Sequence, residues 1–245
     1  MPQFVELDDT VKIWLDFGTG DKRKTYLVNK AYSDLGDAVC RALPFFHALS
    51  GCDSTASFFE KPKKRFFEHW TMYYSRATEI TGAFQQLSGL PTIEAVDFNL
   101  PVIEKFVASL YLHSEKPITV NQLRFELFEG SHCDNFRKLP PSKDALKQHV
   151  LRSSFQAGWV WGNTLSQQPP PSRLEWGWRK YLNEERFLIK WTDSTIEHKT
   201  SITTVTATCR CKSKEAKCTK CTCGKLKIKF KIKFKKLSLK IRFKN

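Results

Sequence analysis

Positive charge is concentrated at one end of this 245-residue chain, and that distribution limits which part of it can form a packed core. The last 37 residues, Cys209 to Asn245, contain 15 lysines and arginines and one acidic residue, Glu215, for a net charge of +14 out of +15. The preceding part is almost neutral and holds most of the aromatic side chains. A neutral body with a basic tail predicts a globular domain joined to a segment that binds polyanions, and a nuclear location.

The neutral part is long enough for one sizeable domain and a smaller module. The sequence contains no apolar stretch of about 18 residues, so we expect no transmembrane segment. The residues Met1 to Glu6 lack the basic flank and apolar run of a secretory signal. Because export is not expected, clustered cysteines are expected to be reduced metal ligands and not disulfides.

Alternating apolar residues predict two neighbouring strands near the start of the chain, Val11–Phe17 and Thr25–Val28, joined by a glycine-containing turn. From Ala31 the apolar period becomes helical. Pro44 is expected to interrupt this helix, and a second short helix is expected to stop at Gly51.

Apolar stripes predict four later helices, each with its own start signal. The expected starts are Pro62, Pro101 in a first turn, a capping Thr119, and a cap box at Pro141–Asp144. The fold class is therefore expected to be mixed α/β and mostly helical. The expected organisation is a helical body (1–165), a Pro-rich linker (166–173), a small β segment (174–208), a cysteine module (209–224) and a basic Lys/apolar tail (225–245).

Five of the eight cysteines lie at the start of the tail, with the spacing Cys-x-Cys, six residues, Cys-x2-Cys-x-Cys. Closely spaced thiolates suit Zn²⁺, which takes four sulfur or nitrogen ligands. The predicted metal ligands are Cys209, Cys211, Cys218, Cys221 and Cys223. Basic residues between them would lower thiol pKa values and contact phosphates: Arg210, Lys212, Lys214, Lys217 and Lys220. The alternative is a basic low-complexity tail with incidental cysteines.

Lysine alternates with Leu, Ile or Phe from Lys225 to Lys235. On a strand this pattern places the lysines on one face and the apolar residues on the other. Three interpretations stay open: a phosphate-binding strip, a membrane-surface element, or translation of A/T-rich DNA after a frame change beyond Gly224.

The cysteine module resembles the first half of the CXC (tesmin/TSO1-like) zinc module, a DNA-binding element. The resemblance implies Zn²⁺ as cofactor and DNA as partner. That module has a second cysteine cluster, whereas this chain continues from Gly224 into the lysine alternation. The module is therefore expected to be partial.

The segment Ala42–Phe59, with Gly51-Cys52-Asp53 followed by Lys63-Lys64-Arg65, is the most specific part of the body. It resembles the Gly-Cys-Asp region of flap-endonuclease-like (PIN-like) nucleases. It is more similar to a poorly characterised multicopy animal family that joins such a body to a CXC-like tail. Further matching segments include Trp14–Gly20, Lys105–Val107, Leu110–Tyr111, Asn121–Arg124, Leu139–Pro141, Leu151–Arg152, Phe155–Ala157 and Gly177–Trp178.

In those nucleases the Gly-Cys-Asp carboxylate is one of several that hold Mg²⁺ for phosphodiester hydrolysis. The resemblance assigns this role to Asp53, and phosphate contacts to Lys61, Lys63, Lys64 and Arg65. An upstream Asp-x-Asp strand has no counterpart, so the chain is expected to be N-terminally truncated. One carboxylate cannot hold two metals, and Pro62 removes a backbone donor from the phosphate-binding turn.

The sequence therefore predicts a non-catalytic nucleic-acid-binding protein, with DNA as the expected partner and Zn²⁺ in the tail. Two alternatives remain. One is a Mg²⁺-dependent structure-specific nuclease completed by carboxylates missing from this chain. The other is a non-functional fragment of a multicopy gene.

Overall fold

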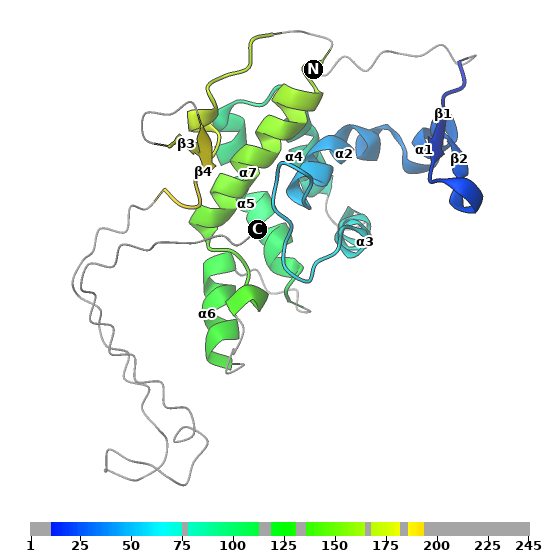
Figure 1. Ribbon diagram of the computed structural model, residues 1–245. Coiled ribbons are helices and arrows are strands. Elements are labelled where there is room, and N and C mark those ends of the chain that lie inside the picture. The colour runs from blue at the N-terminus through cyan, green and yellow to red at the C-terminus, as the bar shows by residue number, and fades with distance from the viewer. Residues whose placement is uncertain are drawn as a thin grey trace, which may run out of the picture. The chain divides into compact units, whose positions relative to one another are not determined.

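The computed structural model describes residues 11–74, 78–112, 119–130, 136–164, 168–181 and 186–193 (Figure 1). All of these ranges fall in one compact unit that ends at Thr195. The fold is mixed α/β and mostly helical, as expected. The elements are β1 (Trp14–Phe17), the 3₁₀ turn η1 (Gly20–Lys22), β2 (Lys24–Leu27), α1 (Val28–Leu35), α2 (Asp37–Leu49), α3 (Lys63–Tyr74), α4 (Thr78–Ser88), α5 (Ile93–Ser109), α6 (Val120–Gly130), η2 (Phe136–Lys138), α7 (Lys143–Ser154), the π-helical turn η3 (Phe155–Trp161), η4 (Arg173–Glu175), β3 (Trp178–Lys180) and β4 (Phe187–Ile189).

The predicted pair of N-terminal strands is confirmed. Strands β1 and β2 pair antiparallel, with Trp14 opposite Leu27. Helix α1 is tied to this hairpin by the side chain of Asn29, whose Oδ1 accepts from the N–H of Ile13 at 2.9 Å and whose Nδ2 donates to the carbonyl of Val11 at 2.9 Å. The hairpin therefore continues directly into the helical part of the chain.

The expected interruption at Pro44 is wrong. Helix α2 runs through Pro44, and the break falls earlier, at Gly36, where φ is +78°. A proline weakens a helix because it lacks an N–H and crowds the preceding turn. Here the next amide, that of Phe45, donates to Oγ of Ser88 on α4 at 3.1 Å. Burial of Phe45 and Phe46 further favours a continuous helix.

The expected helix start at Pro101 is also wrong. Helix α5 begins at Ile93, where Thr92 caps it by accepting from the N–H of Ala95 at 3.2 Å, and Pro101 lies inside it. Both internal prolines sit in helices whose burial outweighs local propensity. The pattern analysis also missed α4, which packs between α2 and α5.

The other helix starts are confirmed. Helix α3 begins directly after Pro62. Thr119 caps α6 by accepting from the N–H of Gln122 at 3.2 Å, and Ser142 caps α7 by accepting from the N–H of Ala145 at 3.2 Å.

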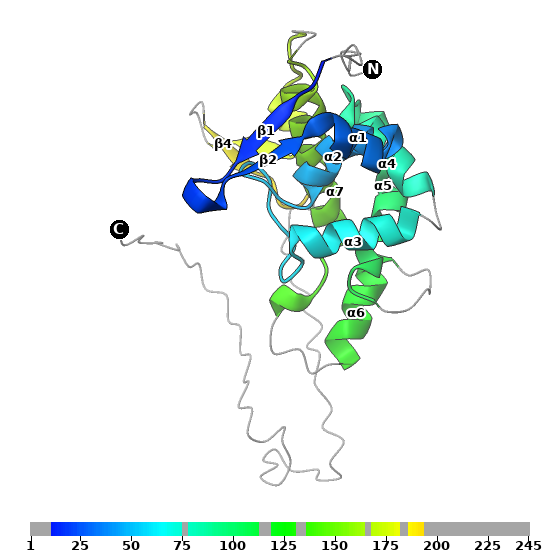
Figure 2. The same cartoon turned by 90° about the vertical axis from the view of Figure 1, so that its right-hand side faces the viewer.

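Aromatic side chains fill the centre of the helical part. The rings of Phe46 and Trp70 stack at 5.0 Å, and Phe84 contacts both Trp70, at 5.3 Å, and Phe106, at 5.5 Å. Trp70 is completely buried, and its indole N–H donates to Oγ1 of Thr81 at 3.0 Å. This cluster joins α2, α3, α4 and α5 (Figure 2).

The C-terminal described segment packs on α7. The 2% exposed Trp176 lies 5.9 Å from the ring of Phe155 and belongs to the same core as the helices. The buried Arg152 donates to the carbonyls of Gly177 at 3.0 Å and Lys190 at 2.7 Å, which holds the β3–β4 hairpin in place.

Among the residues just described, no helix is long and apolar enough to cross a membrane. The cysteine module 209–224 and the tail 225–245 lie outside the described residues, together with the metal ligands and basic residues predicted there.

Candidate nucleic-acid interface

The loop between α2 and α3 and the first turn of α3 carry every candidate site residue that the structure describes. It leaves α2 through Gly51, where φ is +106°, a value that L-residues rarely adopt. A Cβ on Gly51 would lie 2.7 Å from Cβ of Ser57. The loop then makes a tight turn, in which Cys52 and Thr55 exchange backbone hydrogen bonds of 3.1 and 3.3 Å. Glycine at position 51 is therefore required for the loop to fold back toward α3.

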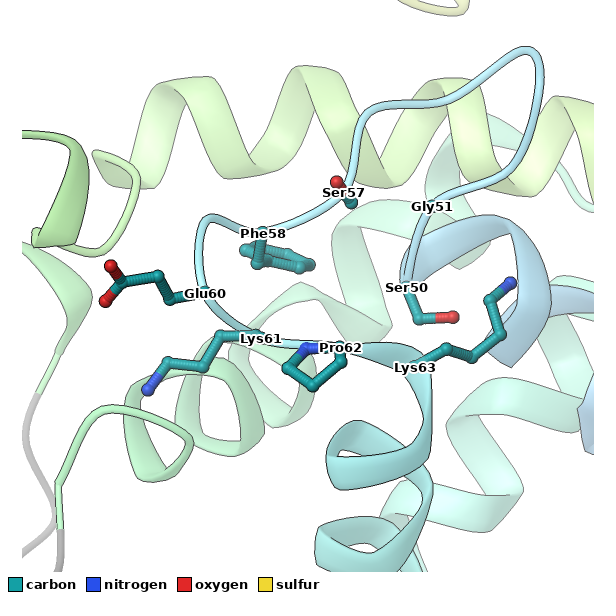
Figure 3. Close-up of a pocket in the computed structure, with 8 residues that line it drawn as sticks. All are labelled: Ser50, Gly51, Ser57, Phe58, Glu60, Lys61, Pro62 and Lys63. Atoms are coloured by element: carbon teal, nitrogen blue, oxygen red, sulfur yellow. The ribbon is translucent and has the colours of Figure 1, made fainter.

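This loop lines an open pocket of about 400 Å³. In Figure 3 the side chains of Glu60 and Lys61 point to one side of the loop, and that of Lys63 points to the other. The pocket lining is Ser50, Gly51, Ser57, Phe58, Glu60, Lys61, Pro62 and Lys63. The structure thus brings Gly51 of the Gly-Cys-Asp segment together with two of the four predicted phosphate contacts.

Lys61 and Lys63 are both held by protein contacts. The Nζ atom of Lys61 lies 4.5 Å from the ring centroid of Tyr111, a cation–π contact. Nζ of Lys63 donates to the carbonyl of His47 at 3.0 Å and lies 3.0 Å from Nδ1 of the same residue. Partial burial lowers the pKa of Lys63, and it lowers the pKa of Lys61 with help from the charge of Arg65. These two lysines form the inner, fixed part of the site.

Lys64 and Arg65 form its outer part, in the first turn of α3. Both are exposed, and Lys64 makes a long ion pair, 3.9 Å, with Glu68. The first intrahelical hydrogen bond of α3 runs from Phe66 N–H to the carbonyl of Pro62, at 3.0 Å. The amides of residues 63–65 therefore precede the helical ladder and point out of the helix N-terminus, where the dipole favours anions.

The electrostatic effect of this cluster extends to two histidines. Burial lowers the pKa of His69, and the charges of Arg65 and Lys61 lower it further. Burial also lowers the pKa of His47, with a contribution from Lys63 that the carboxylate of Asp53 partly opposes. Positive charge thus dominates the space around the α3 N-terminus.

Glu60 is the one acidic residue of the pocket lining. Its backbone has φ of +56°, and its carboxylate lies 3.9 Å from Nζ of Lys138 on η2. The negative charge that the sequence places beside the phosphate site is therefore paired with a cation 78 positions along the chain.

Asp53, the predicted residual metal carboxylate, is exposed in the same loop. Within the described ranges, no three His, Cys, Asp or Glu residues lie in a group able to hold a metal ion. Asp53 therefore lies in the loop that leads into the basic cluster, outside any group of three or more possible metal ligands among the described residues.

Sequence reasoning missed three members of the site: His47 as a partner of Lys63, Tyr111 beneath Lys61, and Lys138 beside Glu60. His47 is close to the site in sequence, four residues before Gly51, so the sequence alone could have suggested it. The other two come from distant segments, and no local pattern connects them to the loop.

No protein-family model, curated protein or solved structure matches this chain.

Proposed function

We propose that this chain is a nucleic-acid-binding protein, with DNA as its partner, that acts without catalysis in the nucleus. The observation that carries the proposal is the basic cluster at the N-terminus of α3, where Lys61, Lys63, Lys64 and Arg65 surround a helix end whose amides face outward. Phosphate groups fit such a site because cationic side chains and free backbone donors act on the same oxygens.

The tail supplies the second part of the proposal. Its net charge of +14 would release many counterions from DNA, so binding would be strong at low salt and weakly dependent on base sequence. The five tail cysteines would hold Zn²⁺ in a partial CXC-like module and keep the basic residues between them together.

We further propose that the body is a remnant of a PIN-like fold in which the Gly51-Cys52-Asp53 segment and α3 keep a phosphate-binding role. Metal-dependent hydrolysis needs several carboxylates around Mg²⁺, and Asp53 alone does not provide them. Binding without cleavage is therefore favoured over the nuclease alternative.

A mobility-shift titration on linear and branched duplex DNA, with Zn²⁺ and Mg²⁺ present, tests this proposal. It compares the full chain with a version that ends at Thr208, 13 residues beyond the compact unit. We expect both to bind, and the shorter chain to bind more weakly and with a shallower dependence on salt. Each phosphate contact that is lost should reduce the slope of log K against log salt by about 0.9.

Charge variants in the full chain separate the two parts of the site. K64Q/R65Q should weaken binding several-fold at every DNA sequence. The matched control, K22Q/K30Q, removes two exposed lysines of the hairpin and α1 and should change nothing; Lys30, like Lys64, is paired with an acid four residues later. Equal effects of both pairs would mean that only net charge matters. Cleavage of the DNA would overturn the non-catalytic assignment.

A further inference from the structure

Three phenylalanines are exposed on and next to α6. The side chain of Phe125 is 60% exposed, that of Phe128 is 50% exposed, and that of Phe136, on η2, is 63% exposed. The rings of Phe128 and Phe136 stack on each other at 5.9 Å, with an interplanar angle of 21°. Exposed aromatic residues that gather in one place mark a contact surface more often than isolated ones do.

This aromatic surface is separate from the buried face of α6. Val120 and Leu123 are completely buried on the core side, and Leu127 packs against the same core. Phe125 and Phe128 are three residues apart, so they share another face of the helix. Figure 2 shows α6 projecting beyond α3, away from the main cluster of helices. Packing among the described residues therefore leaves these rings exposed.

The aromatic surface is connected to the basic cluster of the candidate interface. Residues Arg137 and Lys138 follow Phe136 directly in η2. Nζ of Lys138 lies 3.9 Å from the carboxylate of Glu60 in the pocket lining, and Lys61 is the next residue. A nucleic-acid strand with phosphates on this basic side could therefore reach the rings with its bases.

We propose that Phe125, Phe128 and Phe136 stack on the unpaired bases of single-stranded nucleic acid. This inference rests on the proposed function and adds a substrate class to it. A phenylalanine face can stack on any base, but only when the base is not already stacked inside a duplex. Cations beside rings are the combination that non-sequence-specific single-strand binders use, since the cations hold the backbone while the rings hold the bases.

Charge favours a nucleic acid over a protein as the occupant. The short helix that carries Phe136 ends in two basic residues, and the pocket lining beyond Glu60 includes Lys61 and Lys63. Two exposed acidic residues neighbour the rings in sequence, Glu126 after Phe125 and Glu129 after Phe128. Their charge opposes a phosphate backbone, so E126Q/E129Q should bind single strands more tightly than the unaltered chain.

The test measures fluorescence anisotropy of two probes with the full chain: a thymidine oligonucleotide of about 20 residues, longer than the usual site size, and a duplex of the same length. We expect F128A/F136A to weaken single-strand binding about tenfold or more and to leave duplex binding within about twofold. The matched control is F98A, because Phe98 on α5 is 77% exposed and distant in sequence from the site. It should bind both probes normally.

A second readout reports on the stacking itself. A thymidine oligonucleotide that carries 5-iodouracil should photo-crosslink to peptides that contain Phe125, Phe128 or Phe136. Absence of those crosslinks, or unchanged single-strand binding by F128A/F136A, would overturn the inference while normal duplex binding leaves the proposed function intact. Failure of the unaltered chain to bind either probe would overturn both. Loss of self-association in F128A/F136A without any loss of DNA binding would instead assign the rings to a protein contact.

Discussion

The helical body and the N-terminal hairpin use similar residues in opposite ways. Trp70 in the body is fully buried between Phe46 and Phe84, whereas Trp14 in the hairpin is 60% exposed. The body gains its stability from apolar area removed from water. The hairpin depends on the backbone ladder between β1 and β2 and on the two hydrogen bonds of Asn29.

The two regions differ in burial because they differ in how many layers of secondary structure pack together. Each of the helices α2 to α7 buries an apolar face in the common core. The hairpin has apolar residues on both faces, with Leu15, Phe17 and Tyr26 on one and Trp14 on the other, because side chains alternate along a strand. A two-stranded ribbon cannot cover both of its faces, and such ribbons are marginal alone. A similar apolar content therefore gives a core in one region and an exposed surface in the other.

The largest effect is expected at Trp70. W70A removes a fully buried ring that contacts Phe46, Phe67 and Phe84, and should lower the free energy of unfolding by about 4 kcal/mol. Urea denaturation followed by circular dichroism measures it. W70F keeps an aromatic ring but loses the hydrogen bond to Thr81 and part of the buried indole volume, so it should cost less than W70A. A loss below about 1 kcal/mol for W70A would mean that the aromatic cluster does not hold the body together.

A pH effect of nearly the same size is expected at His149 on α7. Burial lowers the pKa of His149 to about 4, even though its Nε2 lies 2.8 Å from the carbonyl of Leu49, a contact that opposes the shift, while the charge of Arg152 adds to the lowering. The unfolded chain, with a pKa near 6.5, binds the proton first. The contribution of His149 to the free energy of unfolding is therefore fully present above about pH 6.5. It falls by about 3 kcal/mol as the pH approaches 4.

The measurement is the unfolding free energy of the unaltered chain and of H149Q between pH 7 and pH 4. The other titrating groups are common to both proteins, so the difference between the two curves isolates His149. Glutamine can still donate to Leu49 but does not titrate in this range. If the two curves of unfolding free energy against pH run parallel, the assignment of this pH dependence to His149 is wrong. The hairpin contains no histidine, so no histidine titration should change its local stability over this pH range.

Local sequence signals predicted the elements better than they predicted the contacts between them. The hairpin and the starts of α3, α6 and α7 follow from alternation, proline and capping residues, which act over a few positions. The predictions at Pro44 and Pro101 were wrong because burial favours a continuous helix where the local preference of proline opposes it. At Pro44 the Ser88 hydroxyl, 43 positions away from Phe45, also accepts the amide that follows the proline. The basic residues of the candidate site were readable, whereas Tyr111 and Lys138 reach it only through the tertiary fold.

A smaller effect is expected at the two glycines with positive φ that flank α2. At Gly51 a Cβ would meet the backbone and Cβ of Ser57 at 2.8 and 2.7 Å, whereas at Gly36 it would meet nothing within 4 Å. G51A should therefore cost about 2 kcal/mol and weaken DNA binding, because the loop must shift. G36A carries only the conformational cost, about 1 kcal/mol, and should leave binding unchanged. Equal costs at both sites would show that contact with Ser57 does not constrain the loop.

The smallest effect is expected at Trp14, the counterpart of Trp70. Because the ring is 60% exposed, W14A should change the free energy of global unfolding by less than about 0.5 kcal/mol. Amide hydrogen exchange is the more sensitive measurement. The β1–β2 amides should exchange much faster than those of α2 and α5, and W14A should not change the exchange rates of the α2 and α5 amides. A global loss as large as that of W70A would mean that the hairpin is part of the same cooperative core. The two regions would then differ in exposure without differing in their contribution to stability.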